Sequence, residues 1–225
     1  MLKATTPLHA ASAALRALLP AALGALILAG CGLGARPYPL VRTFTLDPSS
    51  PQGAETGGAK RPKASLIVTA APPPGAYEGK KLVFMMKSRE LTADFYNELS
   101  SPPARAVADG VAKRLELSEP QLLVARSQGA READWALEIS LMDIYGDLSR
   151  EGQFTAQMAV TATLSDLRRS SPRPAYVRDF VFSIPVSRGP DDSRAEALVK
   201  AYSEGVSRMA EELRPEIRRL VLGRR

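Results

Sequence analysis

Hydrophobic and polar residues alternate along much of the second half of the chain. The alternation is clearest at 135–142, where every second side chain is large and apolar: Trp135, Leu137, Ile139 and Leu141. The stretch 154–164 repeats it, and a segment with glycines and aspartate separates the two. Because successive strand side chains point to opposite faces, the pattern predicts two half-buried strands joined as a hairpin. Shorter apolar runs predict further strands at 41–46, 65–70, 82–86, 122–124 and 176–184.

Two other stretches place apolar residues at helical spacing. One is 103–117, with Ala104, Val107, Val111 and Leu115, and the other begins at Asp192, with Ala195, Leu198, Tyr202, Val206, Met209 and Leu213. Each pattern predicts a helix with one apolar side, and Pro215 should kink or restart the second helix. Mutual burial of these apolar sides predicts an α+β fold for residues 41–225: an antiparallel sheet with two amphipathic helices packed on one face.

The first 30 residues follow a different pattern. Lys3 and Arg16 are the only charged residues before Cys31, and the segment 17–30 is almost entirely Ala, Leu and Gly. A basic start, a short apolar stretch and small residues at its end are typical of a cleaved secretory signal peptide. A membrane-spanning helix needs about 20 apolar residues, and this segment is shorter and contains Pro20. We therefore predict a lipoprotein signal peptide at 1–30, followed by a tether at 31–40.

The end of this signal resembles a bacterial lipobox, Leu28-Ala29-Gly30-Cys31. A cysteine thiolate is the nucleophile that can form a thioether with a diacylglycerol carrier. Cleavage between Gly30 and Cys31 would then free an amine for a further acyl chain. Since each buried methylene contributes about 0.8 kcal/mol, two or three chains anchor a protein stably. We expect Cys31 to carry diacylglycerol and an acyl chain, with no other cofactor, and Gly32 after it to favour the outer membrane.

Composition limits the chemistry of the remaining chain. The formal charge of +6 comes from 30 Lys and Arg against 24 Asp and Glu. Without residues 1–30 the counts are 28 and 24, a charge of +4, with no histidine and only the cysteine that is lipidated. Disulfides, Cys/His metal sites and His-dependent catalysis are thereby excluded. The chain has no nucleophile elbow or phosphate-binding loop motif, so we expect no catalytic residue, no metal and no nucleic-acid partner.

Several motifs together resemble one family, the ABC-type transport auxiliary lipoproteins, which act with mammalian-cell-entry (MCE) lipid transport systems. The first two are the lipobox, followed by an aromatic strand that ends in Thr45-Leu46, and a Pro-rich turn with Tyr77 before Lys81-Leu82-Val83. The third is the pair Phe95-Tyr96 before the first helix. The last two are the segment Trp135-Ala136-Leu137-Glu138-Ile139 and an Ala-rich helix at 195–210. The resemblance covers nearly the whole chain after residue 30.

The resemblance implies a non-enzymatic protein on the periplasmic face of the outer membrane. Its partners would be an MCE-domain protein, an inner-membrane ABC transport complex and phospholipid, and homo-oligomerisation stays open. Within the chain, Pro74, Tyr77 and Met85 are the expected partner-binding residues. A Pro-rich loop loses little entropy on docking, and an exposed Tyr77 would supply contact area, so Tyr77→Ala should weaken partner binding while sparing stability.

Two alternatives remain from the sequence. A lipoprotein regulator of a peptidoglycan-synthesis enzyme also combines an anchor with a small α+β domain. The tether is short, however: about ten residues at roughly 3.3 Å each reach about 33 Å, which keeps the domain near the membrane. A carboxylate-dependent hydrolase is the other alternative. Bound lipid would favour transport, whereas capture by the sacculus would favour the regulator.

Overall fold

The computed structural model describes residues 40–48, 61–126, 133–171 and 173–223. Its contacts divide the chain into Met1–Leu40 and Val41–Arg225. All buried residues of the described hydrophobic core lie between Leu46 and Val221, inside the second unit. This unit therefore contains its own core, which is the property that lets a domain fold alone. The predicted signal peptide, lipidation site and most of the tether, at residues 1–39, lie outside the described residues.

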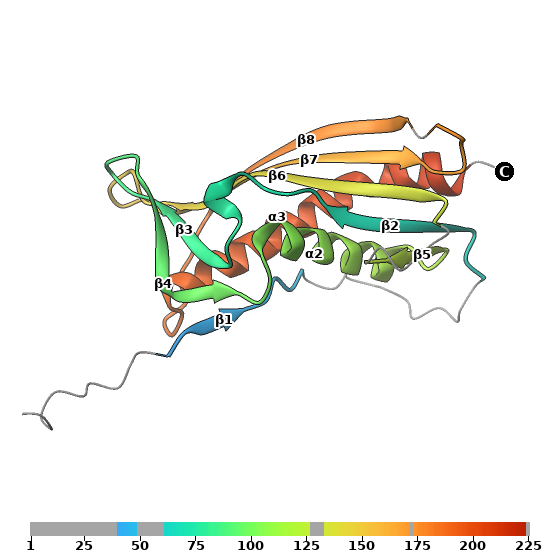
Figure 1. The fold of residues 1–225 in the computed structure, drawn as a ribbon. Helices are drawn as coiled ribbons and strands as arrows, with labels where there is room; N and C mark the ends of the chain where they lie inside the picture. Colours follow the sequence, from blue (N-terminus) through green and yellow to red (C-terminus); the bar gives the residue numbers. More distant parts are fainter. Residues whose placement is uncertain (1–39, 49–60, 127–132, 172, 224–225) are drawn as a thin grey trace, which may run out of the picture. The chain divides into compact units, whose positions relative to one another are not determined.

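The described part of the second unit forms one eight-stranded sheet (Figure 1). The strands are β1 (Arg42–Phe44), β2 (Ala64–Ala70), β3 (Lys81–Met85), β4 (Leu91–Leu99), β5 (Leu122–Ala125), β6 (Trp135–Asp147), β7 (Thr155–Asp166) and β8 (Pro174–Pro185). One side of β6 pairs with β7, which pairs with β8. The other side pairs first with β2 and then with β3, so that β2–β5 and β3–β4–β1 continue the sheet separately.

The α+β class is confirmed, but the strand directions differ from the antiparallel expectation. Only the pairs β3–β4, β6–β7 and β7–β8 are antiparallel. The pairs β1–β4, β2–β5, β2–β6 and β3–β6 are parallel. Parallel neighbours need a long crossover connection, such as the one through the first helix between β2 and β5. Hydrophobic alternation identifies a strand but carries no information about its direction, so the mixed sheet could not be derived from it.

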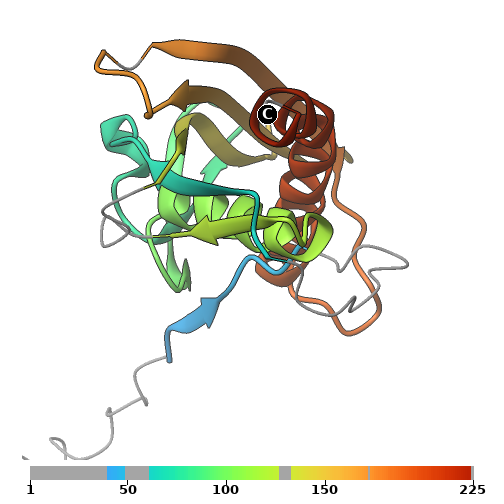
Figure 2. The same ribbon diagram turned by 90° about the vertical axis from the view of Figure 1, so that its right-hand side faces the viewer.

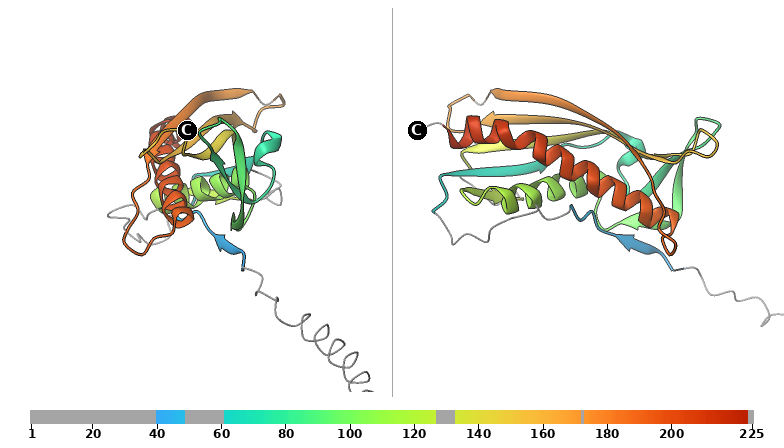
Figure 3. Two further views of the ribbon diagram at one scale, coloured as in Figure 1. Left: turned by 90° about the vertical axis from the view of Figure 1, so that its left-hand side faces the viewer. Right: turned by 180° about the vertical axis from the view of Figure 1, so that it is seen from behind.

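Two helices cover one face of the sheet, as predicted (Figures 2 and 3). They are α2 (Pro103–Ser118), which contacts β2, β5 and β6, and α3 (Arg194–Ile217), which contacts β7 and β8. The hydroxyl of Ser193 caps α3 by accepting the amide N–H of Glu196 at 3.2 Å. The helix continues through Pro215 and becomes a π-helix at Arg218–Leu222. None of the described helices is long and apolar enough to cross a membrane.

The alternation of β6 is buried in the predicted register. The side chains of Trp135, Leu137, Ile139 and Leu141 are at most 1% exposed, whereas Glu138 faces solvent. A bulge between Leu141 and Asp143 then shifts the phase, so that Ile144 is buried. On β7 and β8 the matching inward residues are Ala156, Met158, Val160, Ala162, Leu164, Phe180, Phe182 and Ile184. The helices and this face of the sheet therefore share one core.

Strand β4 is the element that the sequence did not predict. Five of its nine residues are exposed and three are half-buried, in no simple alternation, and within this strand only Leu99 at its end is buried. Its pairing with β3 shifts register between Lys81 and Val83, which shows an irregularity in the ladder. A strand whose side chains are mostly exposed lacks the hydrophobic period on which strand prediction depends.

Candidate functional site

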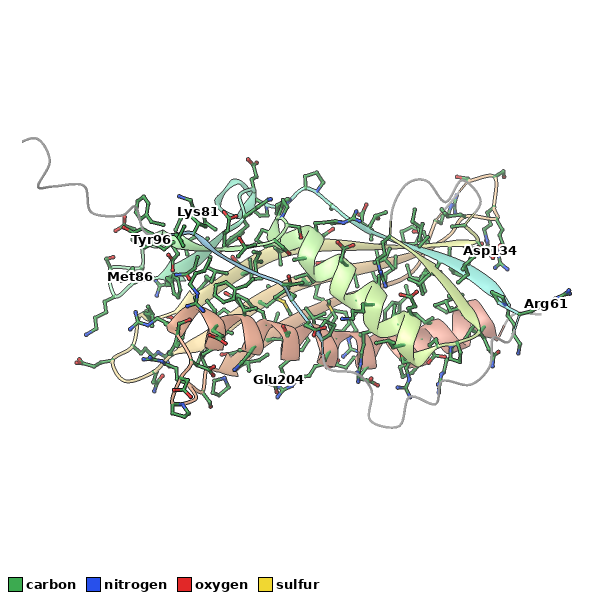
Figure 4. All side chains as sticks on the ribbon, turned by 90° about the horizontal axis from the view of Figure 1, so that it is seen from below. Arg61, Lys81, Met86, Tyr96, Asp134 and Glu204 are labelled. Carbon is green, nitrogen blue, oxygen red and sulfur yellow. The ribbon has the colours of Figure 1, made fainter. Side chains whose placement is uncertain are left out.

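A pocket of about 470 Å³ lies where β1, β3 and β4 meet the start of α3. Its volume falls within the range of roughly 300–1,000 Å³ that is common for small-molecule sites. The lining residues are Arg42, Phe84, Met86, Thr92, Ala93, Asp94, Tyr96, Asn97, Leu148, Ser193, Arg194 and Ala195. Figure 4 shows Met86 and Tyr96 near each other at the same end of the domain as Lys81. Residues from five separate segments therefore come together here.

The walls of this pocket are mainly apolar. Phe84 comes from β3 and is buried, and Ala195 lies in the first turn of α3. Leu148 is held in place by its backbone N–H, which donates to the carbonyl of Met85 at 2.9 Å. Met86 is 39% exposed and lines the wall where β3 ends. These side chains offer a surface for an apolar group of a ligand.

The rim of the pocket carries positive charge. Arg42 contacts Glu196 at 3.4 Å, but both side chains are more than a third exposed, so this ion pair contributes little and can open. Arg194 is exposed and, within the described residues, makes no ion pair. The N-terminus of α3, where Ser193 caps the helix, adds the partial positive charge of the helix dipole. The arrangement suits an anionic group next to an apolar one.

A carboxylate organises the β4 side of the pocket. Asp94 accepts the backbone N–H groups of Tyr96 and Asn97 at 2.8 and 3.1 Å. Its second oxygen accepts the side-chain amide of Asn97 at 2.8 Å. These three bonds fix a tight local turn within the strand. Asp94 is therefore occupied by its own strand and leaves the cations at the rim uncompensated by it.

The carboxylates just before α3 also have structural partners. Asp192 accepts the ammonium of Lys200 at 2.7 Å and the backbone N–H of Gly189 at 3.1 Å. The hydrogen bond from Lys200 is the main cause that lowers the pKa of Asp192, so this carboxylate stays ionised. The next residue, Ser193, is the cap of α3. Within the described residues, no three His, Cys, Asp or Glu side chains gather as metal ligands.

The expectation that Tyr77 is exposed is wrong. Its side chain is 3% exposed, and its hydroxyl donates to the carboxylate of Asp143 at 3.1 Å. Burial, followed by the charge of Asp143, raises the pKa of Tyr77. The backbone N–H of Tyr77 also donates to the carbonyl of Pro74 at 2.8 Å, closing the turn Gly75–Tyr77. The loop thus folds inward around its tyrosine, and Tyr77→Ala would disturb the core rather than an exposed contact.

The other predicted residues are not gathered into one site. Pro74 is exposed at the start of the short turn, and Met85 is half-buried in β3. Neither lines the pocket, whereas the neighbouring Met86 does. Gly30 and Cys31 lie outside the described residues. The partner-binding role of Pro74 and Met85 stays a prediction.

Sequence reasoning missed the pocket because its walls come from distant segments. Arg42, Phe84 and Arg194 belong to three elements that are far apart in the chain. None carries a local motif. The sequence singled out Met85 as a partner-binding residue, whereas the side chain that is exposed at the pocket is that of the neighbouring Met86.

Comparison with solved structures supports the fold. A crystal structure from Xanthomonas campestris, described as belonging to the family DUF330, is 18% identical and has a TM-score of 0.54, with 80% of this chain and 92% of that chain covered. An uncharacterised protein is 14% identical with a TM-score of 0.55, covering 79% and 99%. A protein from Caulobacter crescentus that is provisionally described as a lipoprotein is 14% identical, with 52% of this chain and 82% of that chain covered. Its TM-score of 0.36 is too low to show a shared fold.

No family model and no curated protein matches the sequence. At these identities the first two structures show that this arrangement of strands and helices exists elsewhere, and no more. The function of the chain is therefore inferred from its own pocket, surface and sequence motifs.

Proposed function

We propose that this chain is a lipid-anchored protein on the periplasmic face of the outer membrane. In this proposal it is a non-enzymatic auxiliary component of an MCE/ABC-type phospholipid transport system, and it holds a phospholipid at the pocket between β4 and α3. The anchor rests on the lipobox that ends at Cys31. The transport role rests on the family resemblance together with the chemistry of the pocket.

The observation that carries the proposal is the combination of an apolar wall with a cationic rim. Phe84, Leu148 and Ala195 offer an apolar surface for part of an acyl chain. Arg42 and Arg194 would face a phosphate at the same opening, and guanidinium groups bind phosphate through paired hydrogen bonds. A phospholipid carries both groups within one molecule, so it matches the pocket better than a purely polar or purely apolar ligand.

The non-enzymatic part of the proposal follows from the residues that remain after processing. Without residues 1–30 the chain has no histidine, and lipidation consumes its cysteine. The carboxylate nearest the pocket, Asp94, is already bonded to three donors of its own strand. Binding a lipid needs none of these groups to transfer a proton, so the pocket suits lipid binding better than catalysis.

The pocket can be tested with the unit Val41–Arg225, because it contains its own core. The unit is expressed in bacteria and purified without added lipid, and the lipid that it carries is measured by native mass spectrometry. Ala195→Trp fills the pocket, and Ala175→Trp, on exposed β8, is the matched control. Replacing both Arg42 and Arg194 by Ala should weaken phospholipid binding about tenfold or more, since hydrogen bonds to charged groups are lost.

We expect lipid on the wild type and the control, and loss of lipid in Ala195→Trp. A wild type without lipid, or an Ala195→Trp variant that retains it, would remove the pocket from the proposal. The anchor is tested separately by mass spectrometry of the full chain made in bacteria. Cys31→Ala should block both lipidation and cleavage before residue 31, and a wild-type chain with unmodified Cys31 would refute the anchor. Co-purification of an MCE-domain protein with the anchored chain tests the transport role.

A further inference from the structure

Two aromatic side chains are held in solvent at the middle of β4. Phe95 is 73% exposed and Tyr96 is 49% exposed, and their ring centroids lie 6.5 Å apart. Together the rings expose a large apolar area that a soluble domain would normally bury. We name Phe95 and Tyr96 the aromatic pair.

The aromatic pair is fixed in place by the strand around it. The three hydrogen bonds accepted by Asp94 shape the backbone of Tyr96 and Asn97. The aromatic pair lies where the ladder between β3 and β4 shifts register, and paired residues hold it from both sides: Ala93 pairs with Val83 before it, and Asn97 pairs with Arg42 after it. The ammonium of Lys81 lies 4.8 Å from the centre of the Phe95 ring, a cation–π contact that orients the ring. The side chains are therefore presented in advance, with little entropy left to lose on docking.

Other exposed apolar side chains lie on the strands next to the aromatic pair and on β4 itself. Val41, just before β1, is 48% exposed, Met86 at the end of β3 is 39% exposed, and Leu91 at the start of β4 is 38% exposed. Tyr96 and Met86 also line the pocket, so the pocket opens beside this surface (Figure 4). β1, β3 and β4 therefore each present exposed apolar side chains at the end of the domain that holds the aromatic pair.

The tether joins the domain beside the same surface. Arg42 is opposite Asn97 in the parallel pairing of β1 with β4, so the chain enters the sheet one residue from Tyr96 in register. Eight residues, 32–39, separate Cys31 from Leu40, so the backbone from Cys31 to Leu40 spans at most about 30 Å. A lipid on Cys31 would therefore keep the start of β1, which pairs next to Tyr96, within about that distance of the bilayer. Tyr and other amphipathic aromatics are enriched at the membrane–water interface.

The charge near the aromatic pair is balanced. The charged residues of β1, β3, β4 and their turns are Arg42, Lys80, Lys81, Lys87 and Arg89 against Glu78, Glu90, Asp94 and Glu98. The first turn of α3 adds one charge of each sign, Arg194 and Glu196. Such a surface gains little from attraction to anionic lipid. Its affinity for a membrane would come from the rings and the aliphatic side chains, which sets it apart from a polybasic patch.

We infer that the aromatic pair is a membrane-docking surface that seats this domain on the headgroup region of the bilayer that carries its anchor. The inference takes the anchor at Cys31 from the proposed function. An anchor and a weak docking surface act together, because the anchor raises the local concentration of membrane for the second contact. Docking in this way places the pocket opening at the lipid headgroups.

The test uses the unit Val41–Arg225, which lacks the anchor, and vesicles of phosphatidylcholine alone or with phosphatidylglycerol. Binding is measured by co-sedimentation. The double variant Phe95→Ala/Tyr96→Ala removes the rings, and Val177→Ala/Val181→Ala removes exposed aliphatic side chains from β8 as the matched control. We expect binding to both vesicle types, weakened about tenfold or more by loss of the rings and little changed in the control.

A second measurement reports insertion directly. Trp135 is fully buried, so a tryptophan placed by Phe95→Trp is the exposed fluorophore. Its emission should shift to shorter wavelength with vesicles and be quenched by brominated lipid. Failure of the wild type to bind either vesicle, or equal binding by the ring-deleted variant, would overturn the inference. Loss of self-association without loss of vesicle binding in that variant would overturn it as well. Phe95 does not line the pocket, so the single variant Phe95→Ala tests docking apart from pocket binding, which is read by mass spectrometry without vesicles. The two proposals can therefore fail independently.

Discussion

Two glycines, one in each helix, offer a direct test of how tightly the helices are packed. Gly110 in α2 and Gly205 in α3 are both buried in helix interiors. A Cβ added to Gly110 would lie 2.8 Å from Cγ1 of Val206, and one added to Gly205 would lie 2.9 Å from Cε of Met158. The two clashes are equally short, but the groups that must move are different.

The two substitutions share one favourable contribution. In a helix interior Ala is favoured over Gly by about 0.8–1.0 kcal/mol. Val206 is β-branched and stiff within α3, so it cannot swing away from a methyl at position 110. Overpacking of this kind costs about 1–3 kcal/mol, and we expect Gly110→Ala to destabilise the domain by roughly 1 kcal/mol. A methyl at position 205 would instead meet Cε of Met158 and, at 3.2 Å, Cδ1 of Ile184. Both are the terminal methyls of flexible side chains, so Gly205→Ala should be neutral or stabilise by up to about 0.5 kcal/mol.

The measurement is urea unfolding of the unit Val41–Arg225, followed by the fluorescence of the single tryptophan, Trp135. A double-mutant cycle sharpens it, since in a Val206→Ala background the clash is gone and Gly110→Ala should stabilise by about 1 kcal/mol. Equal free-energy changes for the two glycines would refute the steric argument. So would an absence of coupling between positions 110 and 206.

Two further predictions concern β6 and β7. Leu137→Asp should unfold the domain because it buries an unpaired charge, whereas Glu138→Lys, one residue out of phase and exposed, should change stability by less than about 0.5 kcal/mol; equal shifts in melting temperature would show that the register is wrong. Asp166 is 5% exposed, and the hydrogen bond from Arg168 is the main cause that lowers its pKa. The stability from this carboxylate is therefore present above about pH 4, the usual pKa of Asp in an unfolded chain, and is lost as pH falls through the lowered folded pKa. Asp166→Asn should accordingly destabilise most at pH 7 and progressively less as pH falls below 4, measured by urea unfolding, and an unchanged difference across that range would contradict the assignment.

The core could be predicted from the sequence because it rests on periodicity. The buried face of β6 and the apolar sides of both helices follow directly from residues two, or three and four, apart. These patterns are local and unambiguous, because a residue next to a buried position, such as Glu138 between Leu137 and Ile139, already faces solvent. These patterns were sufficient to predict the α+β class and the two helices on one face of the sheet.

The candidate site could not be predicted because it depends on pairing between distant segments. The pocket exists because β4 joins β3 and β1, and β4 has no hydrophobic period of its own. The burial of Tyr77 could not be predicted for a related reason, because its partner, Asp143, is in β6 and is brought near Tyr77 only by the sheet. A proline-rich stretch predicts a turn, but not whether the tyrosine within it points outward or inward.

The branching of the sheet at β6 has a consequence for how the chain folds. The hairpins β6–β7 and β7–β8 join neighbours in sequence, so they can form early and quickly. Leu66 of β2 must instead find Trp135 of β6, and Phe84 of β3 must find Gly146, across long intervening segments. Closing such loops is slow, and until it happens both halves of β6 have an open edge. We expect the docking of β2 and β3 to limit the folding rate, so the newly made domain is most exposed to mispairing at one side of this single strand.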